Sequence, residues 1–176
     1  MLVIATDATV QSHAYAAACR ARGLRTLEKA CPLLVPLVEE GWTDHQVTAE
    51  VIRIYLAELT AEAAAQGMNP DVLLLGCTHY PLLRPLLERA VPAGMRVIDS
   101  ADATAEAAVK LIGQQESTKR SPSAKDPSAK DLNAQFPNSQ DQVRCFATDS
   151  VEKFERLGSR FLNRPTGKVE LVDLGG

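Results

Sequence analysis

The sequence predicts an α/β fold built on a parallel, doubly wound sheet. Short apolar runs that suit buried strands alternate with longer helical segments along most of the chain. The strongest of these runs lies in the central stretch DVLLLGCTHYPLLRP, residues 71–85, where it ends at a glycine and passes into a polar turn. Open α/β sheets bind ligands at the carboxyl ends of their strands, so we expect a functional site at this turn.

Length and composition set the class of protein. The chain has 176 residues, of which 45% are hydrophobic and 23% are charged, so it can bury a domain-sized core. The net charge of −3, without a large cluster of Lys or Arg, argues against a nucleic-acid partner. No apolar run reaches the length of a membrane span, and the first residues do not resemble a signal peptide, so we expect a cytoplasmic protein with no membrane partner.

The first elements are a strand, a turn and a helix. Residues 1–5 predict an apolar strand, and residues 10–22 predict a helix that stops at a glycine. In the turn between them, a helix cap is the expected role of Thr9. Residues 24–30 alternate loosely between apolar and polar side chains and predict a second strand.

The next segment leads to the longest helix. Residues 31–41 carry two prolines, an apolar cluster and an acidic pair that begins with Glu39, and such carboxylates are usually solvated surface groups. Thr43 and Gln46 form a capping box that predicts the start of a helix, which stops at Gly67. Its apolar stripe is expected in the core. The stripe consists of Val47, Val51, Ile54, Tyr55 and Leu59.

After the central turn the alternation continues and then breaks off. Residues 96–99 predict a strand, and residues 100–113 predict a capped helix. Residues 114–142 are polar, repeat the tetrapeptide SAKD and have almost no apolar periodicity, so they predict a disordered insertion. A strand, a helix that starts with the pattern D-x-x-E, and a last strand are then expected over residues 143–147, 149–162 and 168–174.

The central turn concentrates reactive side chains. Cys77, Thr78 and His79 place a thiol, a hydroxyl and an imidazole in succession after the buried strand over residues 72–75, and Pro85 fits the first turn of a following helix. A lone cysteine in this position is usually a small buried hydrophobe. A nearby imidazolium and a helix amino end would instead favour the thiolate. The sequence therefore makes Cys77 a candidate reactive thiol.

The other cysteines and the lack of further ligand motifs limit the alternatives. A Cys-x-His pair could bind zinc, but no Cys-x-x-Cys or His-x-x-x-His completes a ligand set, so we expect no metal. The cysteines are widely spaced and are expected to be reduced thiols, not a disulfide framework. They are Cys19, Cys31, Cys77 and Cys145.

The segment GCTHYPLL resembles the second cysteine motif of the glutamate racemases, cofactor-independent enzymes that supply D-glutamate for bacterial peptidoglycan. Further stretches resemble the same family in the same order and cover nearly all of the chain outside residues 114–142. They are VIATDATVQSHAY, ACPLLVPLVEEG, VIDSADATA, FATDSVEKFERLGSRFL and VELVDL.

The resemblance implies a mechanism and a set of site residues. Two cysteines would exchange the α-proton of glutamate on opposite faces, with no pyridoxal phosphate or other cofactor, and Cys77 would be one of the two. It implies that His79 tunes and orients this thiol, that Glu39 orients the histidine, and that Thr78 helps hold the substrate. By the same resemblance, two further hydroxyls would contact the substrate carboxylate. These belong to Thr6 and Thr9.

The resemblance also implies how the chain divides. Residues 1–95 would form the second racemase lobe, while residues 96–113 and 143–176 would return to the first lobe, with residues 114–142 as the insertion. The family's motifs for an amino-terminal lobe, including the first catalytic cysteine, do not occur in the sequence, and Cys19 and Cys31 lie in the wrong context to replace that cysteine. We therefore expect little activity from the chain alone, and either a homodimer or a complementing amino-terminal half as its protein partner.

Two other functions stay open. The chain could belong to a racemase of a related amino acid such as aspartate, or it could be a non-catalytic module that binds an amino acid in the same pocket. In each case the expected ligand is a small molecule.

Overall fold

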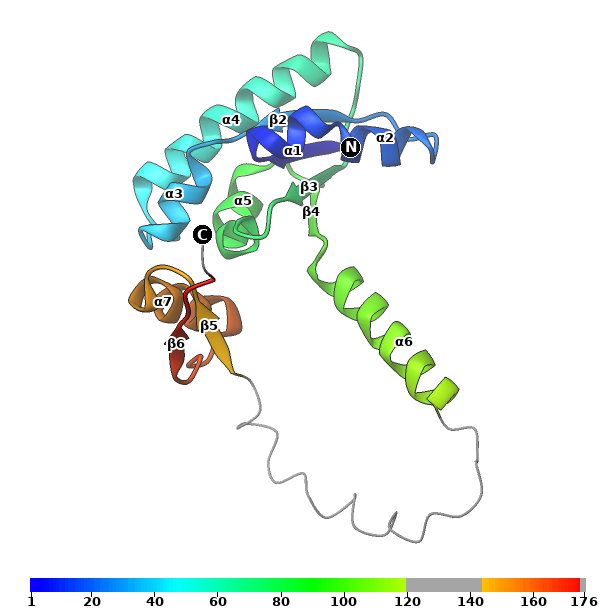
Figure 1. Ribbon diagram of the computed structural model, residues 1–176. Helices are drawn as coiled ribbons and strands as arrows, with labels where there is room; N and C mark the ends of the chain where they lie inside the picture. Colours follow the sequence, from blue (N-terminus) through cyan, green and yellow to red (C-terminus); the bar gives the residue numbers. More distant parts are fainter. Residues whose placement is uncertain (120–143, 175–176) are drawn as a thin grey trace, which may run out of the picture. The chain divides into compact units, whose positions relative to one another are not determined.

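The computed structural model describes residues 1–119 and 144–174, and it describes side chains up to residue 113 in the first of these ranges (Figure 1). The chain divides into two compact units, Met1–Gln115 and Glu116–Gly176. Residues 120–142 of the predicted insertion lie outside the described residues. The assignment of residues 1–95 and of the later segments to different lobes stays a prediction.

A four-stranded parallel sheet forms the centre of the first unit. Its strands are β1 (Leu2–Ala5), β2 (Leu27–Ala30), β3 (Val72–Gly76) and β4 (Arg96–Asp99), in the order β2-β1-β3-β4. The strand order changes direction at β1, so the connections run to opposite edges, and ligands bind at such a switch point in open sheets. The predicted parallel α/β fold is confirmed.

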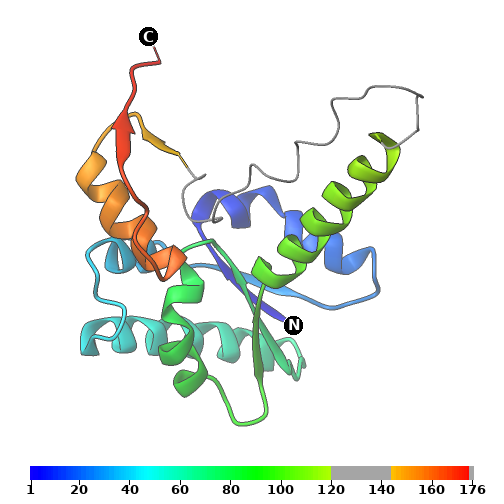
Figure 2. The same ribbon diagram turned by 90° about the horizontal axis from the view of Figure 1, so that it is seen from below.

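Helices cover both faces of this sheet (Figure 2). On one face lie α1 (Asp7–Ser12) and α2 (Ala14–Arg20). On the other lie α3 (Leu34–Glu39), α4 (Gln46–Ala65) and α5 (Arg84–Ala90), with the short 3₁₀ helix η1 (Tyr80–Leu83) leading into α5. Pro85 falls in the first turn of α5, as the sequence predicts.

The main core lies between the sheet and the second of these faces. Alternate residues of the two central strands, Leu2 and Ile4 in β1 and Leu73 and Leu75 in β3, point into it and are at most 1% exposed. Each such side chain contributes about 1.5–3 kcal/mol when fully buried. The helices supply most of the other core residues, including Leu34, Val38, Ile52, Leu56, Leu59 and Leu87.

The helix predicted over residues 10–22 is in fact two short helices. Helix α1 begins earlier, at Asp7, and the helical geometry is interrupted between α1 and α2 at His13, where φ is +52°. The Ser12 hydroxyl donates to the carbonyl of Thr9 at 2.6 Å and accepts the amide hydrogen of Ala14 at 3.3 Å. These side-chain bonds compete with helical bonding and explain the break.

Helix α4 starts later than the predicted capping box. Its N-cap is His45, whose Nδ1 accepts the amide hydrogen of Val47 at 3.1 Å, so the prediction of a box from Thr43 and Gln46 is wrong. An imidazole in the required tautomer can take the place of the usual cap oxygen. Sequence preference for Ser, Thr, Asp or Asn at this position therefore pointed to the wrong residue.

The predicted core stripe of α4 is only partly correct. Leu59 is buried, but Val47 and Ile54 are 46% and 45% exposed. The buried face includes Thr48, whose hydroxyl donates to the carbonyl of Trp42 at 2.7 Å. This hydrogen bond satisfies a polar side chain in the core, and the rest of the buried face consists of Ile52, Leu56, Leu59 and Ala63.

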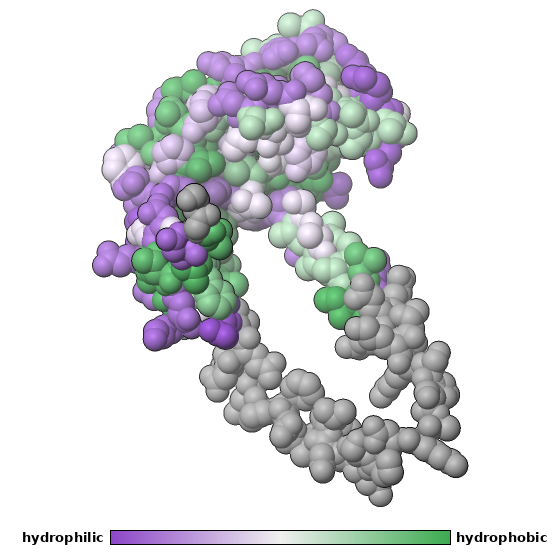
Figure 3. Space-filling model, in the orientation of Figure 1, coloured by the Kyte–Doolittle hydropathy of each residue, from purple (hydrophilic) through white to green (hydrophobic). Residues whose placement is uncertain are grey.

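Helix α6 (Ala101–Lys119) continues beyond Gly113, where the sequence predicts its end. The Asp99 carboxylate accepts the amide hydrogen of Ala101 at 2.9 Å at its start. Residues 101–113 are all exposed, and apolar residues colour this helix green in Figure 3. The large ones are Val109, Leu111 and Ile112.

Among the described residues, no helix combines the length and apolar character that crossing a membrane requires.

The second unit contains a small β-α-β arrangement. Strands β5 (Cys145–Ala147) and β6 (Val169–Leu171) pair in parallel, and α7 (Val151–Leu162) connects them. The cap of α7 is Ser150, which accepts the amide hydrogen of Lys153 at 3.2 Å, and the helix starts one residue after this cap. The predicted order of strand, helix and strand is confirmed, with shorter strands.

Candidate active site

The turn after β3 presents the thiol that the sequence singles out. Gly76 is the last residue of the strand, and Cys77 follows on a bend with its side chain partly exposed. The Cys77 Sγ lies 3.8 Å from Nδ1 of His79, within the range of a hydrogen bond to sulfur. The thiol is therefore accessible and paired with the imidazole two positions later.

A carboxylate approaches the other side of the imidazole. The Glu39 Oε1 lies 3.4 Å from Nε2 of His79, and the two side chains are 28% and 24% exposed. Glu39 is the last residue of α3, so the contact joins two segments far apart in the sequence. Carboxylate, imidazole and thiol thus form one chain of contacts, an arrangement that can orient a histidine and favour the thiolate next to it.

The two threonines lie at the same edge of the sheet. Ala5, the last residue of β1, is the register partner of Gly76, so Thr6 and Cys77 leave neighbouring strands at the same level. Thr6 is the N-cap of α1: its Oγ1 accepts the amide hydrogen of Thr9 at 3.4 Å and lies 3.0 Å from the Thr9 hydroxyl. The cap role expected for Thr9 therefore belongs to Thr6.

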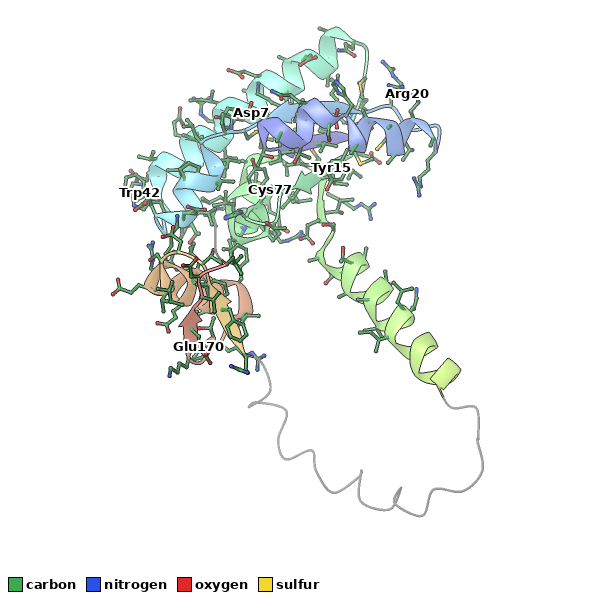
Figure 4. All side chains as sticks on the ribbon, in the orientation of Figure 1. Asp7, Tyr15, Arg20, Trp42, Cys77 and Glu170 are labelled. Atoms are coloured by element: carbon green, nitrogen blue, oxygen red, sulfur yellow. The ribbon has the colours of Figure 1, made fainter. Side chains whose placement is uncertain are left out.

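A tyrosine that the sequence does not single out packs against Gly76, the residue before the thiol. A Cβ on Gly76 would lie 3.0 Å from Tyr15 Cε2, 3.0 Å from the Ala5 Cβ and 3.1 Å from the Ile4 carbonyl. Tyr15 of α2 is thus in close contact with the backbone just before Cys77, and Figure 4 labels both. Tyr15 lies within the motif VIATDATVQSHAY, but nothing in its spacing indicates this contact.

Replacing Gly76 with alanine is expected to destabilise the fold by about 1–3 kcal/mol, because the added methyl group would lie 3.0–3.1 Å from the Tyr15 ring, the Ala5 Cβ and the Ile4 carbonyl, and these atoms would have to shift. Thermal or denaturant unfolding would measure the change. Gly113→Ala is the matched control, since an added Cβ there meets nothing within 4 Å. Equal stability of the two variants would contradict the close packing around Gly76.

The other cysteines differ from Cys77 in their surroundings. Cys19 and Cys31 are buried, and burial raises the pKa of Cys31 to about 12, so that thiol stays protonated at neutral pH. Cys145 is partly exposed but belongs to the second unit. Within residues 1–119 and 144–174, no group of three or more His, Cys, Asp or Glu side chains could hold a metal ion.

These features define a class: a parallel α/β protein with a paired thiol and imidazole at the ligand-binding edge of its sheet. Comparison with known families agrees with this class. The chain belongs to the family described as Asp/Glu/Hydantoin racemase, whose model matches residues 1–108.

Individual relatives are named more narrowly. The chain is 47% identical to a glutamate racemase of Koribacter versatilis over 179 residues, covering 99% of this chain and 60% of the relative. It is 38% identical over 175 residues to a glutamate racemase of Neisseria meningitidis serogroup A, covering 98% of this chain and 56% of the relative. The chain thus spans somewhat more than half the length of these relatives.

Solved structures give the same assignment of family and fold. A glutamate racemase of Francisella tularensis in complex with D-glutamate matches with a TM-score of 0.74 at 26% identity, covering 98% of this chain and 57% of that chain. A glutamate racemase of Thermus thermophilus in complex with β-chloro-D-alanine matches with a TM-score of 0.69 at 30% identity, covering 98% and 56%.

Proposed function

We propose that this chain is the Cys77-bearing part of a glutamate racemase, which interconverts L- and D-glutamate without a cofactor. The contact chain from Glu39 through His79 to Cys77 at the edge of the sheet carries this proposal. Glutamate is the proposed substrate because the relatives are named glutamate racemases and one matched structure holds D-glutamate. Supply of D-glutamate for peptidoglycan in the cytoplasm is the proposed role.

The proposed reaction moves one proton off the α-carbon and another onto it. The Cys77 thiolate takes the α-proton from one face and becomes a thiol, leaving a carbanion. A second thiol on the opposite face then donates its proton, which inverts the centre. His79 pairs with the thiolate and Glu39 orients the imidazole.

Polar groups at the same edge would hold the substrate. Thr78 is exposed beside the reacting thiol, and its hydroxyl and backbone amide are proposed to bind the amino acid. Thr6 and Thr9, at the adjoining end of β1, are proposed to contact a substrate carboxylate. Preorganised donors of this kind stabilise the negative charge that develops when the α-proton leaves.

The second thiol is proposed to come from a counterpart of the region of the relatives that this chain does not cover. Residues 1–95 would be one lobe. Residues 96–113, which begin in strand β4 of that lobe's sheet, and residues 143–176 would return to the other lobe, with the insertion over residues 114–142 between these two segments. The exposed apolar residues of α6 support this division, because helices normally bury such a stripe. The proposed partner is a complementing amino-terminal half or a second copy of the chain.

We expect the 176-residue chain alone to exchange little or no α-hydrogen. Incubating it with D-glutamate in deuterated water and following the α-proton by NMR tests this. The control is a completed chain, in which the unmatched part of the Koribacter versatilis relative precedes this sequence. Exchange by the 176-residue chain at the rate of the completed chain would contradict the proposed division of the site.

Aspartate is the alternative substrate, because the family model covers aspartate and hydantoin racemases as well as glutamate racemases. Comparing the turnover of aspartate and glutamate by the completed chain separates the two. If the completed chain bound glutamate without exchanging its α-hydrogen, and Cys77→Ser left that binding unchanged, the protein would be a binding module and not a racemase.

A further inference from the structure

We propose that Tyr80 is a positioning residue, whose hydroxyl holds the turn carrying Cys77 and His79 against the segment that leads to Glu39. This inference rests on the proposed function, since it concerns the geometry of the same three side chains. It assigns a role to a residue whose side chain is fully buried.

Tyr80 forms hydrogen bonds both to the turn that carries Cys77 and to the segment after β2. Its side chain is fully buried, and its hydroxyl donates to the backbone carbonyl of Cys31 at 3.1 Å, across 49 residues of sequence. Its own amide hydrogen donates to the carbonyl of Cys77 at 3.2 Å. Tyr80 therefore connects the end of β3 directly to the segment after β2.

Cys31 is a fixed point because its backbone is held by several elements. Its amide hydrogen donates to the carbonyl of Ala5 at the end of β1, at 2.8 Å. Its carbonyl also accepts the amide hydrogen of Leu34, the first residue of α3, at 3.2 Å. The Tyr80 hydroxyl thus bonds to the connection between β2, the edge strand of the sheet, and α3.

These bonds close a ring of contacts around the site. The ring runs from Tyr80 to Cys31, through α3 to Glu39, from Glu39 to His79, and back to Tyr80 through one peptide bond. Helix α3 has only six residues, so fixing its first turn also limits where Glu39 can lie. Without the Tyr80 bond, α3 and the cysteine turn could shift relative to one another and lengthen the contact between Glu39 and His79.

The Tyr80 phenol is a permanent donor and not a proton-transfer group. Burial raises its pKa well above the usual range for tyrosine, and the neighbouring ionisable groups shift it in the same direction. Those groups are Cys31, Cys77, Tyr55 and Asp7. The phenol therefore stays protonated at neutral pH and remains a hydrogen-bond donor to the Cys31 carbonyl.

Tyr80→Phe in the 176-residue chain removes only the hydroxyl. We expect iodoacetamide to alkylate Cys77 about three- to ten-fold more slowly near neutral pH, because the lost hydrogen bond is one of those that close the ring of contacts. The pH at which the alkylation rate is half-maximal is expected to rise. Mass spectrometry of the separated cysteine peptides gives the rate at each pH. Tyr55→Phe is the matched control, since the Tyr55 hydroxyl accepts the amide hydrogen of Leu33 in the same loop at 3.4 Å but comes from α4.

A cycle with Glu39→Gln separates positioning from a general loss of stability. If Tyr80 acts through Glu39, Tyr80→Phe changes the pH profile of Cys77 alkylation in the wild-type protein but changes it little further in the Glu39→Gln background. Thermal unfolding of each variant checks that both tyrosine variants are folded. A pH profile for Tyr80→Phe that coincides with that of the wild-type protein, while Glu39→Gln still shifts it, would overturn the role of Tyr80 and leave the proposed function standing. Insensitivity of the profile to both Glu39→Gln and Tyr80→Phe would overturn both.

Discussion

Replacing Cys77 with serine is expected to lower exchange of the α-hydrogen of glutamate by the completed chain by at least about 10³-fold. The serine side chain is close in size and keeps the turn, but an alkoxide is far less accessible than a thiolate at neutral pH. The thiolate is also the group that contact with His79 can favour. Proton NMR in deuterated water measures the loss.

Cys145→Ser is the matched control for this prediction. Cys145 is also a partly exposed free thiol, but it lies in the second unit, with its Sγ 3.8 Å from the carbonyl of Thr166. We expect this variant to keep its exchange rate. If Cys77→Ser retained exchange within ten-fold of the parent, the thiol could not be the base.

His79→Asn in the completed chain is expected to lower exchange by about 10²–10⁴-fold, the range for removing a group that assists proton transfer. The asparagine amide can occupy the place of Nδ1 near the Cys77 sulfur, so the turn keeps a polar partner. It cannot carry the charge that stabilises a thiolate or connect the sulfur to Glu39. The same deuterium measurement gives the rate.

The chain contains a closely matched control for the histidine. His13 also contacts a carboxylate, with Nδ1 3.4 Å from Oε2 of Glu28, but it lies between α1 and α2. Its φ of +52° suits asparagine, so His13→Asn is expected to fold normally and keep its exchange rate. Equal losses in His13→Asn and His79→Asn would mean that neither loss reports on the site.

The central turn could be predicted from the sequence because its signals are local. A buried apolar run, a terminal glycine and a proline in the next helix together fix a strand, a turn and a helix. The same rules place Cys77 and His79 at the carboxyl end of a parallel strand. The structure confirms that placement, and the roles of the two side chains remain proposals.

Contacts between distant segments could not be predicted in this way. The hydrogen bond from Tyr80 to Cys31 spans 49 residues, and no spacing rule links the two positions. The approach of Glu39 to His79 followed from a resemblance, because an acidic residue at a helix end is ordinarily a solvated group. The buried face of α4 also includes Thr48, whose hydroxyl bonds to the carbonyl of Trp42, and hydrophobic periodicity does not predict a buried threonine.

Protection of Cys77 by substrate tests most directly whether this thiol faces the α-carbon of glutamate. The completed chain would be treated with iodoacetamide at rising concentrations of glutamate, and the alkylation rates of Cys77 and Cys145 would be compared. We predict that glutamate slows labelling of Cys77 in a saturable manner and leaves Cys145 unchanged. Unchanged labelling of Cys77 at a glutamate concentration that saturates exchange would contradict the placement of this thiol in the substrate pocket.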